Sequence, residues 1–199
     1  MTPQVETYNG NMVNLINPES DTIELEDIAR ALSKMSRYNG HTRSEFGYSV
    51  AQHSVWVAAA LTYFDEFGVH NDAFKAALLH DAHEAYTGDI VKPLKQYIDP
   101  AVTIMQNKLD DVIMDALNVA RPSVDVKEQI KIIDQWALSM ESRKFMHSGG
   151  IGWNLPEAPN HLLPEVMEPL PPSDACQLFM SAWTLIDLGM GEELQGLCQ

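Results

Sequence analysis

The sequence predicts a mainly helical single domain that begins with a short β-hairpin. Apolar residues recur at three- and four-residue spacing in several segments, which is typical of helices with one buried face. Near the N-terminus, Asn9-Gly10 is a tight-turn signal between two short extended runs. No internal repeat, low-complexity tract or domain boundary divides residues 1–199, so one all-α domain is expected.

The expected elements follow in chain order. A hairpin is predicted over residues 6–15, and the first helix carries an apolar stripe of Leu25, Ile28, Ala29 and Leu32. Asn71 and Gly88 supply start and stop signals around the third helix, and Asp99-Pro100 begins the fourth. Helices are expected over residues 24–35, 50–67, 71–86, 100–117 and 124–147, and from Ser173 onward.

Residues 148–173 hold six of the eleven prolines and three glycines. We expect an ordered loop here rather than a linker, because Ile151, Trp153, Leu155 and Leu170 are apolar side chains that favour burial. These side chains exceed what a small helical domain easily buries, which favours a homo-oligomer with this segment or the hairpin near the interface.

The composition excludes several classes of protein. The formal net charge of −15 disfavours a nucleic-acid polymer as partner, although a small nucleotide held by a metal remains compatible with it. The longest apolar run, Val55–Leu61, is far shorter than a membrane span, and the first ten residues do not resemble a secretory signal. With two cysteines and no disulfide framework, a cytoplasmic location is expected.

Histidines and aspartates lie on faces that should be apolar. His53 is one turn before Val57, His80 and Glu84 share a face with Ala76 and Ala77, and Asp134 follows Ile130 and Ile133. Burying such groups without partners would cost on the order of a few kcal/mol each. A divalent cation satisfies two imidazoles and two carboxylates together, and this ligand set suits Zn, Mn, Fe or Co better than Ca or Mg.

Each residue taken alone has a simpler interpretation. His53 could be a hydrogen-bonded core histidine, and Asp134 could pair with Arg143. The carboxylates of Glu84 and Asp89 could be helix caps. His83 is adjacent to the motif, but we expect it on the flank, outside the ligand set.

The pattern His53, His80-Asp81, Asp134 resembles the H…HD…D signature of the HD-domain phosphohydrolases. The likeness extends to SRYNGHT, YSVAQHSVWVA, LLHDAHEAYTGDIVKPLK and IDQWALSME, and covers nearly the whole chain. Together these segments are similar to bacterial 5′-deoxynucleotidases and phage dATP triphosphohydrolases. The resemblance implies an HD-domain helical bundle, a divalent metal (Zn, Co or Mn) and the ligands His53, His80, Asp81 and Asp134.

The resemblance also implies roles beside the metal. Glu84 and Asp89 match the two acidic catalytic residues of that family, with the acid and base roles left open. Arg37-Tyr38 stands where the deoxynucleotidases have an Arg-Trp pair that holds phosphate and base, at slightly different spacing from His53. Further expected substrate contacts are Arg43 and Lys92 to phosphate and Pro93 against the sugar, although lysines here could equally be surface charges.

The leading hypothesis is hydrolysis of deoxynucleotides at the α-phosphate, with dATP giving deoxyadenosine and triphosphate, and with dADP and dAMP also accepted. The alternatives are a 5′-deoxynucleotidase acting on monophosphates, a phosphodiesterase of a nucleotide signal, and a metal-stabilised binding scaffold without turnover. The expected partners are a small nucleotide and further copies of the chain (a dimer or hexamer), with neither nucleic acid nor membrane. If the gene belongs to a phage, the location is the host cytoplasm.

Overall fold

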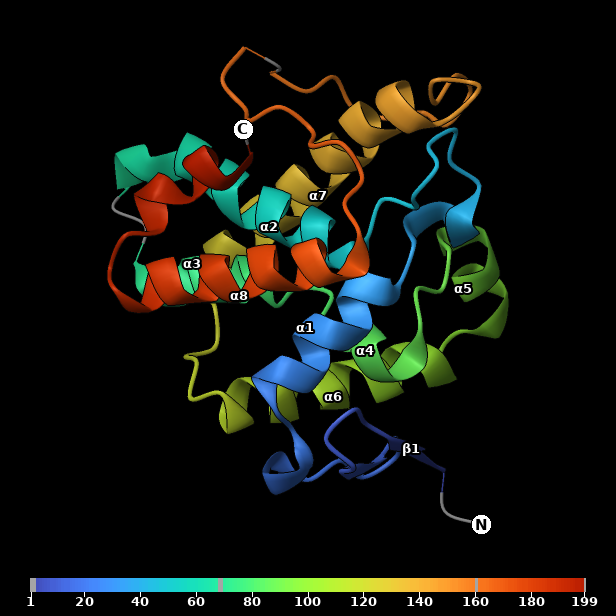
Figure 1. The fold of residues 1–199 in the computed structure, drawn as a ribbon, viewed down its shortest axis with the longest axis vertical. Coiled ribbons are helices and arrows are strands. Elements are labelled where there is room, and N and C mark those ends of the chain that lie inside the picture. The colour runs from blue at the N-terminus through green and yellow to red at the C-terminus, as the bar shows by residue number, and fades with distance from the viewer. Residues whose placement is uncertain (1–2, 68–69, 160, 199) are drawn as a thin grey trace.

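A computed structural model describes residues 3–67, 70–159 and 161–198. It confirms the predicted all-α class with a short N-terminal hairpin (Figure 1). In the described part of the chain, no helix is both long and apolar enough to cross a bilayer. The elements are β1 (Gln4–Glu6), β2 (Met12–Asn14), α1 (Leu25–Lys34), α2 (Val50–Ala60), α3 (Asn71–Leu78), α4 (Glu84–Thr87), α5 (Lys92–Ile98), α6 (Ala101–Ala116), α7 (Val124–Phe145) and α8 (Pro172–Asp187), with 3-10 segments at Ser20–Thr22, Arg37–Gly40, Leu61–Phe67 and Gly191–Cys198.

The hairpin pairs β1 with β2 in antiparallel register around the turn at Gly10, which has φ 86°. It is fixed to α1 by polar contacts: the backbone N–H of Asn9 donates to Asp27 Oδ1 at 2.9 Å, and Asn11 Nδ2 donates to Glu24 Oε1 at 2.8 Å. The side chain of Asp27 is therefore both buried and hydrogen-bonded.

Helix α2 is the centre of the molecule, since all eleven of its residues are buried. It packs against α1, α3, α7 and α8, which surround it in Figure 1. Ser49 caps its N-terminus by accepting a hydrogen bond from the Gln52 N–H at 3.2 Å. Most of the helix is alanine, valine and tryptophan, as expected of a helix enclosed on every side. His53 is thus placed in the deepest part of the core.

Two predicted helices end earlier than expected. The helix predicted over residues 50–67 is α-helical only to Ala60 and continues as a tighter 3-10 segment. The helix predicted over residues 71–86 stops at Leu78, and α4 begins only at Glu84. Between them the chain turns through i to i−3 hydrogen bonds, such as Ala82 N–H to the Leu79 carbonyl at 2.9 Å. Gly88, with φ 80°, ends α4 as predicted.

Helix α5 was not predicted, because a proline within a chain often ends a helix. Pro93 instead lies in the first turn of α5, where its missing N–H would be unpaired in any case. The short helix carries no buried residue, so it has no apolar stripe that periodicity could detect.

The proline-rich segment lies across α2. Gln52 holds it by two bonds, donating to the Glu168 carbonyl at 2.8 Å and accepting from the Leu170 N–H at 3.0 Å, and Trp56 Nε1 donates to the Pro164 carbonyl at 3.0 Å. The expected burial of its apolar side chains is wrong for Ile151, which is 84% exposed, and for Trp153, which is 40% exposed. Ala158, Leu163 and Val166 are the side chains of this segment that enter the core.

Shortening a side chain packed around α2 should destabilise the fold. Leu32 of α1 is fully buried, so Leu32→Ala is expected to lower the free energy of unfolding by about 2–5 kcal/mol. Leu188→Ala, at a position 68% exposed, is the matched control and should stay within about 0.5 kcal/mol of the parent. Urea unfolding followed by circular dichroism measures both, and equal effects would contradict the assigned core.

Candidate metal centre

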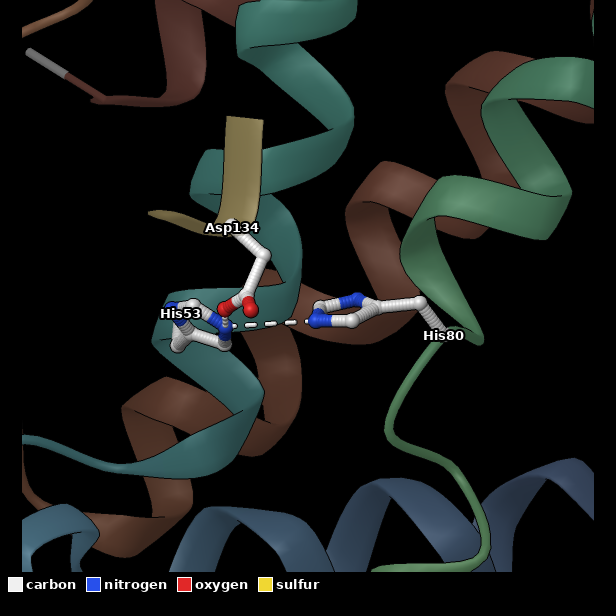
Figure 2. A group of neighbouring side chains, drawn as sticks. All are labelled: His53, His80 and Asp134. Atoms are coloured by element: carbon white, nitrogen blue, oxygen red, sulfur yellow. Dashed lines mark hydrogen bonds and ion pairs between the residues drawn. The ribbon is translucent and has the colours of Figure 1, made fainter. Parts of the chain in front are cut away.

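Two helices and a turn bring the four predicted ligands together. His53 lies on α2, Asp134 on α7, and His80 and Asp81 in the turn that follows α3. Figure 2 shows the side chains of His53, His80 and Asp134 pointing toward one another. The Nε2 of His53 is 3.2 Å from the Nε2 of His80 and 3.2 Å from Oδ1 of Asp134. Asp81 Oδ2 is 3.1 Å from His80 Nε2 and 3.6 Å from His53 Nε2. His80, Asp81 and Asp134 therefore all lie within 3.2–3.6 Å of the Nε2 of His53.

The end of α3 explains how two adjacent residues reach the same point. Successive side chains on a regular α-helix project about 100° apart, since a turn holds about 3.6 residues. Beyond Leu78 the chain leaves the α-helix, and the turn over residues 79–83 presents both His80 and Asp81 to His53. The helix break is therefore part of the site.

The other ring nitrogen of each histidine has a fixed partner. His80 Nδ1 lies 2.8 Å from the Ala77 carbonyl, which only accepts, so this nitrogen carries a proton. His53 Nδ1 lies 2.7 Å from Glu141 Oε1, a carboxylate oxygen that binds the Nδ1 proton in the same way. In the neutral form, both imidazoles then direct an Nε2 lone pair toward the common point, as metal-binding histidines do.

The separations fit a bound cation. Metal–ligand bonds of about 2.0–2.2 Å at tetrahedral or octahedral angles put neighbouring ligand atoms about 2.8–3.6 Å apart. The distances from His53 to His80 and to Asp134, both 3.2 Å, and from His80 to Asp81, 3.1 Å, meet this spacing. His53 is fully buried, whereas the Asp134 side chain is 42% exposed, which leaves the cluster open to solvent on that side. This cluster of imidazoles and carboxylates could hold a metal ion.

Glu141 was not predicted as a site residue, although it is the last residue of the quoted IDQWALSME segment. It lies two turns after Asp134 on the same face of α7 and is fully buried. Its carboxylate accepts from Arg37 Nε at 2.9 Å and from the Tyr38 hydroxyl at 2.8 Å, besides its bond to His53. The spacing of seven residues from Asp134 was the available signal.

The charges in the cluster stabilise one another. Burial raises the pKa of Asp81, but His80, His53 and Arg37 together hold it far below its usual range. Burial and Arg37 lower the pKa of His53, but the larger opposite effect of Glu141 and Asp134 raises it overall, to about 9. Without a metal, His53 is therefore an imidazolium paired with two carboxylates.

The two predicted catalytic carboxylates lie beside this cluster. Glu84 is 8% exposed, and burial, Asp81 and Asp89 raise its pKa to about 10. Burial also raises the pKa of Asp89, against the opposing effect of Arg37, and Asp81 raises it as well. Both carboxyl groups therefore lie close enough to Asp81 for its charge to raise their pKa values.

Arg37 and Tyr38 enter the site through the loop between α1 and α2. A bridge between Ser36 and Ser49 closes this loop, and the Arg37 N–H donates to the Tyr48 carbonyl at 2.9 Å. Gly47 packs so closely on Ser36 that a Cβ there would overlap it. The closed loop places Arg37 Nη1 3.8 Å from Asp81 Oδ2, with the Tyr38 ring 6.2 Å from the Trp153 ring, centroid to centroid.

Three other residues that were predicted to contact the substrate lie away from the ligand cluster. The Arg43 guanidinium donates to the Lys144 carbonyl at the end of α7, at 3.0 Å. Lys92 and Pro93 are exposed in the first turn of α5, and no bond in the described residues joins them to the cluster. His83 is on the flank, as expected, and its Nδ1 lies 2.8 Å from Oδ1 of Asp110 on α6.

Two proteins are similar to this chain along most of their length. The uncharacterized protein YfdR of Escherichia coli is 35% identical over 177 residues, which cover 88% of this chain and 91% of that protein. This chain belongs to the YfdR family. The uncharacterized protein RCAP_rcc00048 of Rhodobacter capsulatus is 32% identical over 139 residues, or 68% of this chain and 69% of its own length. No model of a known protein family matches the chain.

Removing one carboxylate from the cluster should abolish metal binding. Asp81→Asn leaves His80 and His53 with one anionic partner fewer, so we expect elemental analysis of the purified variant to find no tightly bound divalent metal. Asp125→Asn, an exposed position of α7, is the control and should bind as the parent does. Parent-like metal content in the Asp81 variant would remove Asp81 from the ligand set.

The raised pKa of His53 predicts how stability depends on pH. A group whose pKa is higher in the folded state, here about 9 against about 6.5 unfolded, stabilises the fold fully below pH 6.5 and loses that contribution as pH rises through 9. The metal-free protein should therefore lose stability between pH 6.5 and 9. With metal bound the dependence should reverse, because a ligand imidazole must first lose its proton. Urea unfolding at pH 6, 7.5 and 9, with chelator or with Mn²⁺, measures this, and His53→Gln should flatten the metal-free slope.

Proposed function

We propose that this protein is a metal-dependent phosphohydrolase that cleaves deoxynucleotides at the α-phosphate, with dATP as its preferred substrate. The observation that carries the proposal is an arginine beside a solvent-accessible cluster of metal ligands. Arg37 lies 3.8 Å from Asp81, and the cluster opens to solvent at Asp134. An arginine next to a cation is a favourable place for a phosphate group.

His53, His80, Asp81 and Asp134 would hold the cation. A divalent cation there supplies Lewis acidity toward a phosphate oxygen and lowers the pKa of water. Arg37 retains hydrogen-bond donors beyond the Nε that it gives to Glu141, and these can bind a second phosphate oxygen. Arg37 is thereby an orienting group for the phosphorus that reacts.

Glu84 and Asp89 would handle the protons. Cleavage of the bond between the α-phosphorus and O5′ requires a proton to leave the attacking water and another to reach the departing oxygen. Both carboxyl groups lie beside the predicted ligands, and burial raises the pKa of each, to about 10 for Glu84, which favours the protonated form. Triphosphate and deoxyadenosine would then be the products from dATP.

Tyr38 and Trp153 favour a nucleoside over a simple phosphate ester. The Tyr38 hydroxyl donates a hydrogen bond to Glu141, and the Tyr38 ring lies beside the Trp153 ring. Two aromatic rings therefore lie near Arg37, the proposed phosphate-binding residue. Stacking of a base on such rings stabilises nucleotide binding by about 1–3 kcal/mol. The preference for deoxyribose and for adenine follows from the resemblance to dATP triphosphohydrolases.

The products of dATP test the proposal. Purified protein incubated with Mn²⁺ and separate dNTPs, NTPs and dNMPs should convert dATP to deoxyadenosine and triphosphate, and should also act on dADP and dAMP. Chromatography of the products identifies the bond that is cut. Formation of dADP and phosphate would refute cleavage at the α-phosphate. Turnover of monophosphates alone would make the protein a 5′-deoxynucleotidase, and no turnover would favour a binding scaffold.

Asp89→Asn should separate chemistry from binding. The amide cannot take up a proton, so kcat should fall by about 10²-fold or more if Asp89 moves a proton in the reaction. The cluster metal and the affinity for dATP should be retained, as measured by elemental analysis and calorimetry. Asp125→Asn is again the control, and an unchanged kcat in Asp89→Asn would exclude the residue from proton transfer.

A further inference from the structure

A second group of ligand atoms lies next to the first. Asp81, His83 and Glu84, all in or just after the turn between α3 and α4, each offer one ligand atom within 4.8 Å of the others. His83 and Glu84 are each 8% exposed. One imidazole and two carboxylates are therefore gathered in a nearly closed space.

The Glu84 carboxylate lacks a partner for one of its oxygens. Among the described residues, Glu84 Oε2 is buried and accepts no hydrogen bond. A buried carboxylate oxygen without a donor is costly, and natural structures seldom leave one unsatisfied. An oxygen of this kind, next to Asp81 and an imidazole, indicates a cation as its partner.

His83 is oriented in the same manner as the two predicted ligand histidines. Its Nδ1 lies 2.8 Å from Asp110 Oδ1, just as His53 Nδ1 lies 2.7 Å from Glu141. A carboxylate on one ring nitrogen fixes the tautomer and directs the lone pair of the other nitrogen at a metal. The Asp110–His83 pair is therefore the arrangement expected behind a metal ligand.

Asp81 belongs to both groups. It lies 3.1 Å from His80 in the first group and within 4.8 Å of His83 and Glu84 in the second.

We propose that His83 and Glu84 bind a second divalent cation, with Asp81 shared between it and the first. A site of two carboxylates and one imidazole suits Mn²⁺ better than a thiolate-preferring metal. With a second ion bound, Glu84 would be a metal ligand, and Asp89 alone would transfer the proton. Paired metals stabilise both the attacking and the departing oxygen in phosphoryl transfer, a role that rests on the proposed function, whereas the binding itself does not.

Counting bound Mn²⁺ tests the second site. Full-length protein stripped with chelator and titrated with Mn²⁺ should bind two equivalents, measured by the electron paramagnetic resonance signal of free Mn²⁺ and by calorimetry. His83→Gln and Glu84→Gln should each bind one. His147→Gln and Glu128→Gln, at exposed positions, are the matched controls and should bind two.

Asp110→Asn gives a test that does not disturb the buried ligands. The Asp110 side chain is 35% exposed and the change is isosteric, so the fold should be kept, as circular dichroism would verify. Weaker orientation of His83 should lower the affinity for the second equivalent by about 10–100-fold and leave the first unchanged.

The outcomes separate this proposal from the proposed function. A parent protein that saturates at one equivalent, or a His83→Gln variant that still binds two, overturns the second site. Hydrolysis of dATP with a single bound ion would refute the second site alone. Two bound ions without hydrolysis of any nucleotide would refute the function alone.

Discussion

A single buried carboxylate organises the functional end of this molecule. Glu141 is fully enclosed, and burial by itself opposes its ionisation, but Arg37 and His53 lower its pKa and keep it charged. A charge in that position is stable only while its hydrogen-bond donors stay in place. The consequence is a mutual constraint, because α7, α2 and the loop before α2 must all keep their positions for Glu141 to remain paired.

This constraint on Glu141 determines the geometry of the candidate metal site. His53 cannot rotate without leaving Glu141, so its Nε2 is directed at His80 and Asp134. Arg37 is held by the same carboxylate and is thereby kept at the edge of the cluster. The all-round burial of α2 supports the arrangement from behind, since a helix enclosed on every side has little freedom to shift.

Much of this could be predicted from the sequence, and the rest could not for physical reasons. His53 and Asp134 were found because a polar residue on an apolar helical face is conspicuous. The break after Leu78 was missed because Ala76, Ala77, His80 and Glu84 keep helical spacing through it, so periodicity carries no sign of the turn. Helix α5 was missed because it has no buried face. The Asp110–His83 pair was missed because Asp110 lies on another helix, α6, far from His83 in the sequence. Contacts of that kind depend on tertiary packing, which local patterns do not encode.

The loop between α1 and α2 is closed at its base, and Arg43 bonds its middle to the end of α7. The Ser36–Ser49 bridge, the Arg37–Tyr48 hydrogen bond and the close packing of Gly47 on Ser36 fix both ends. Ser44, Glu45 and Phe46 lie between Arg43 and this base, and in the described part of the chain they form no hydrogen bond with the ligand cluster. Changes of composition at residues 44–46 should therefore leave the ligand cluster in place, whereas a side chain at position 47 would overlap Ser36 and push the two ends of the loop apart. Such a division would let the outer part of the loop vary in sequence while the ligand cluster keeps its geometry.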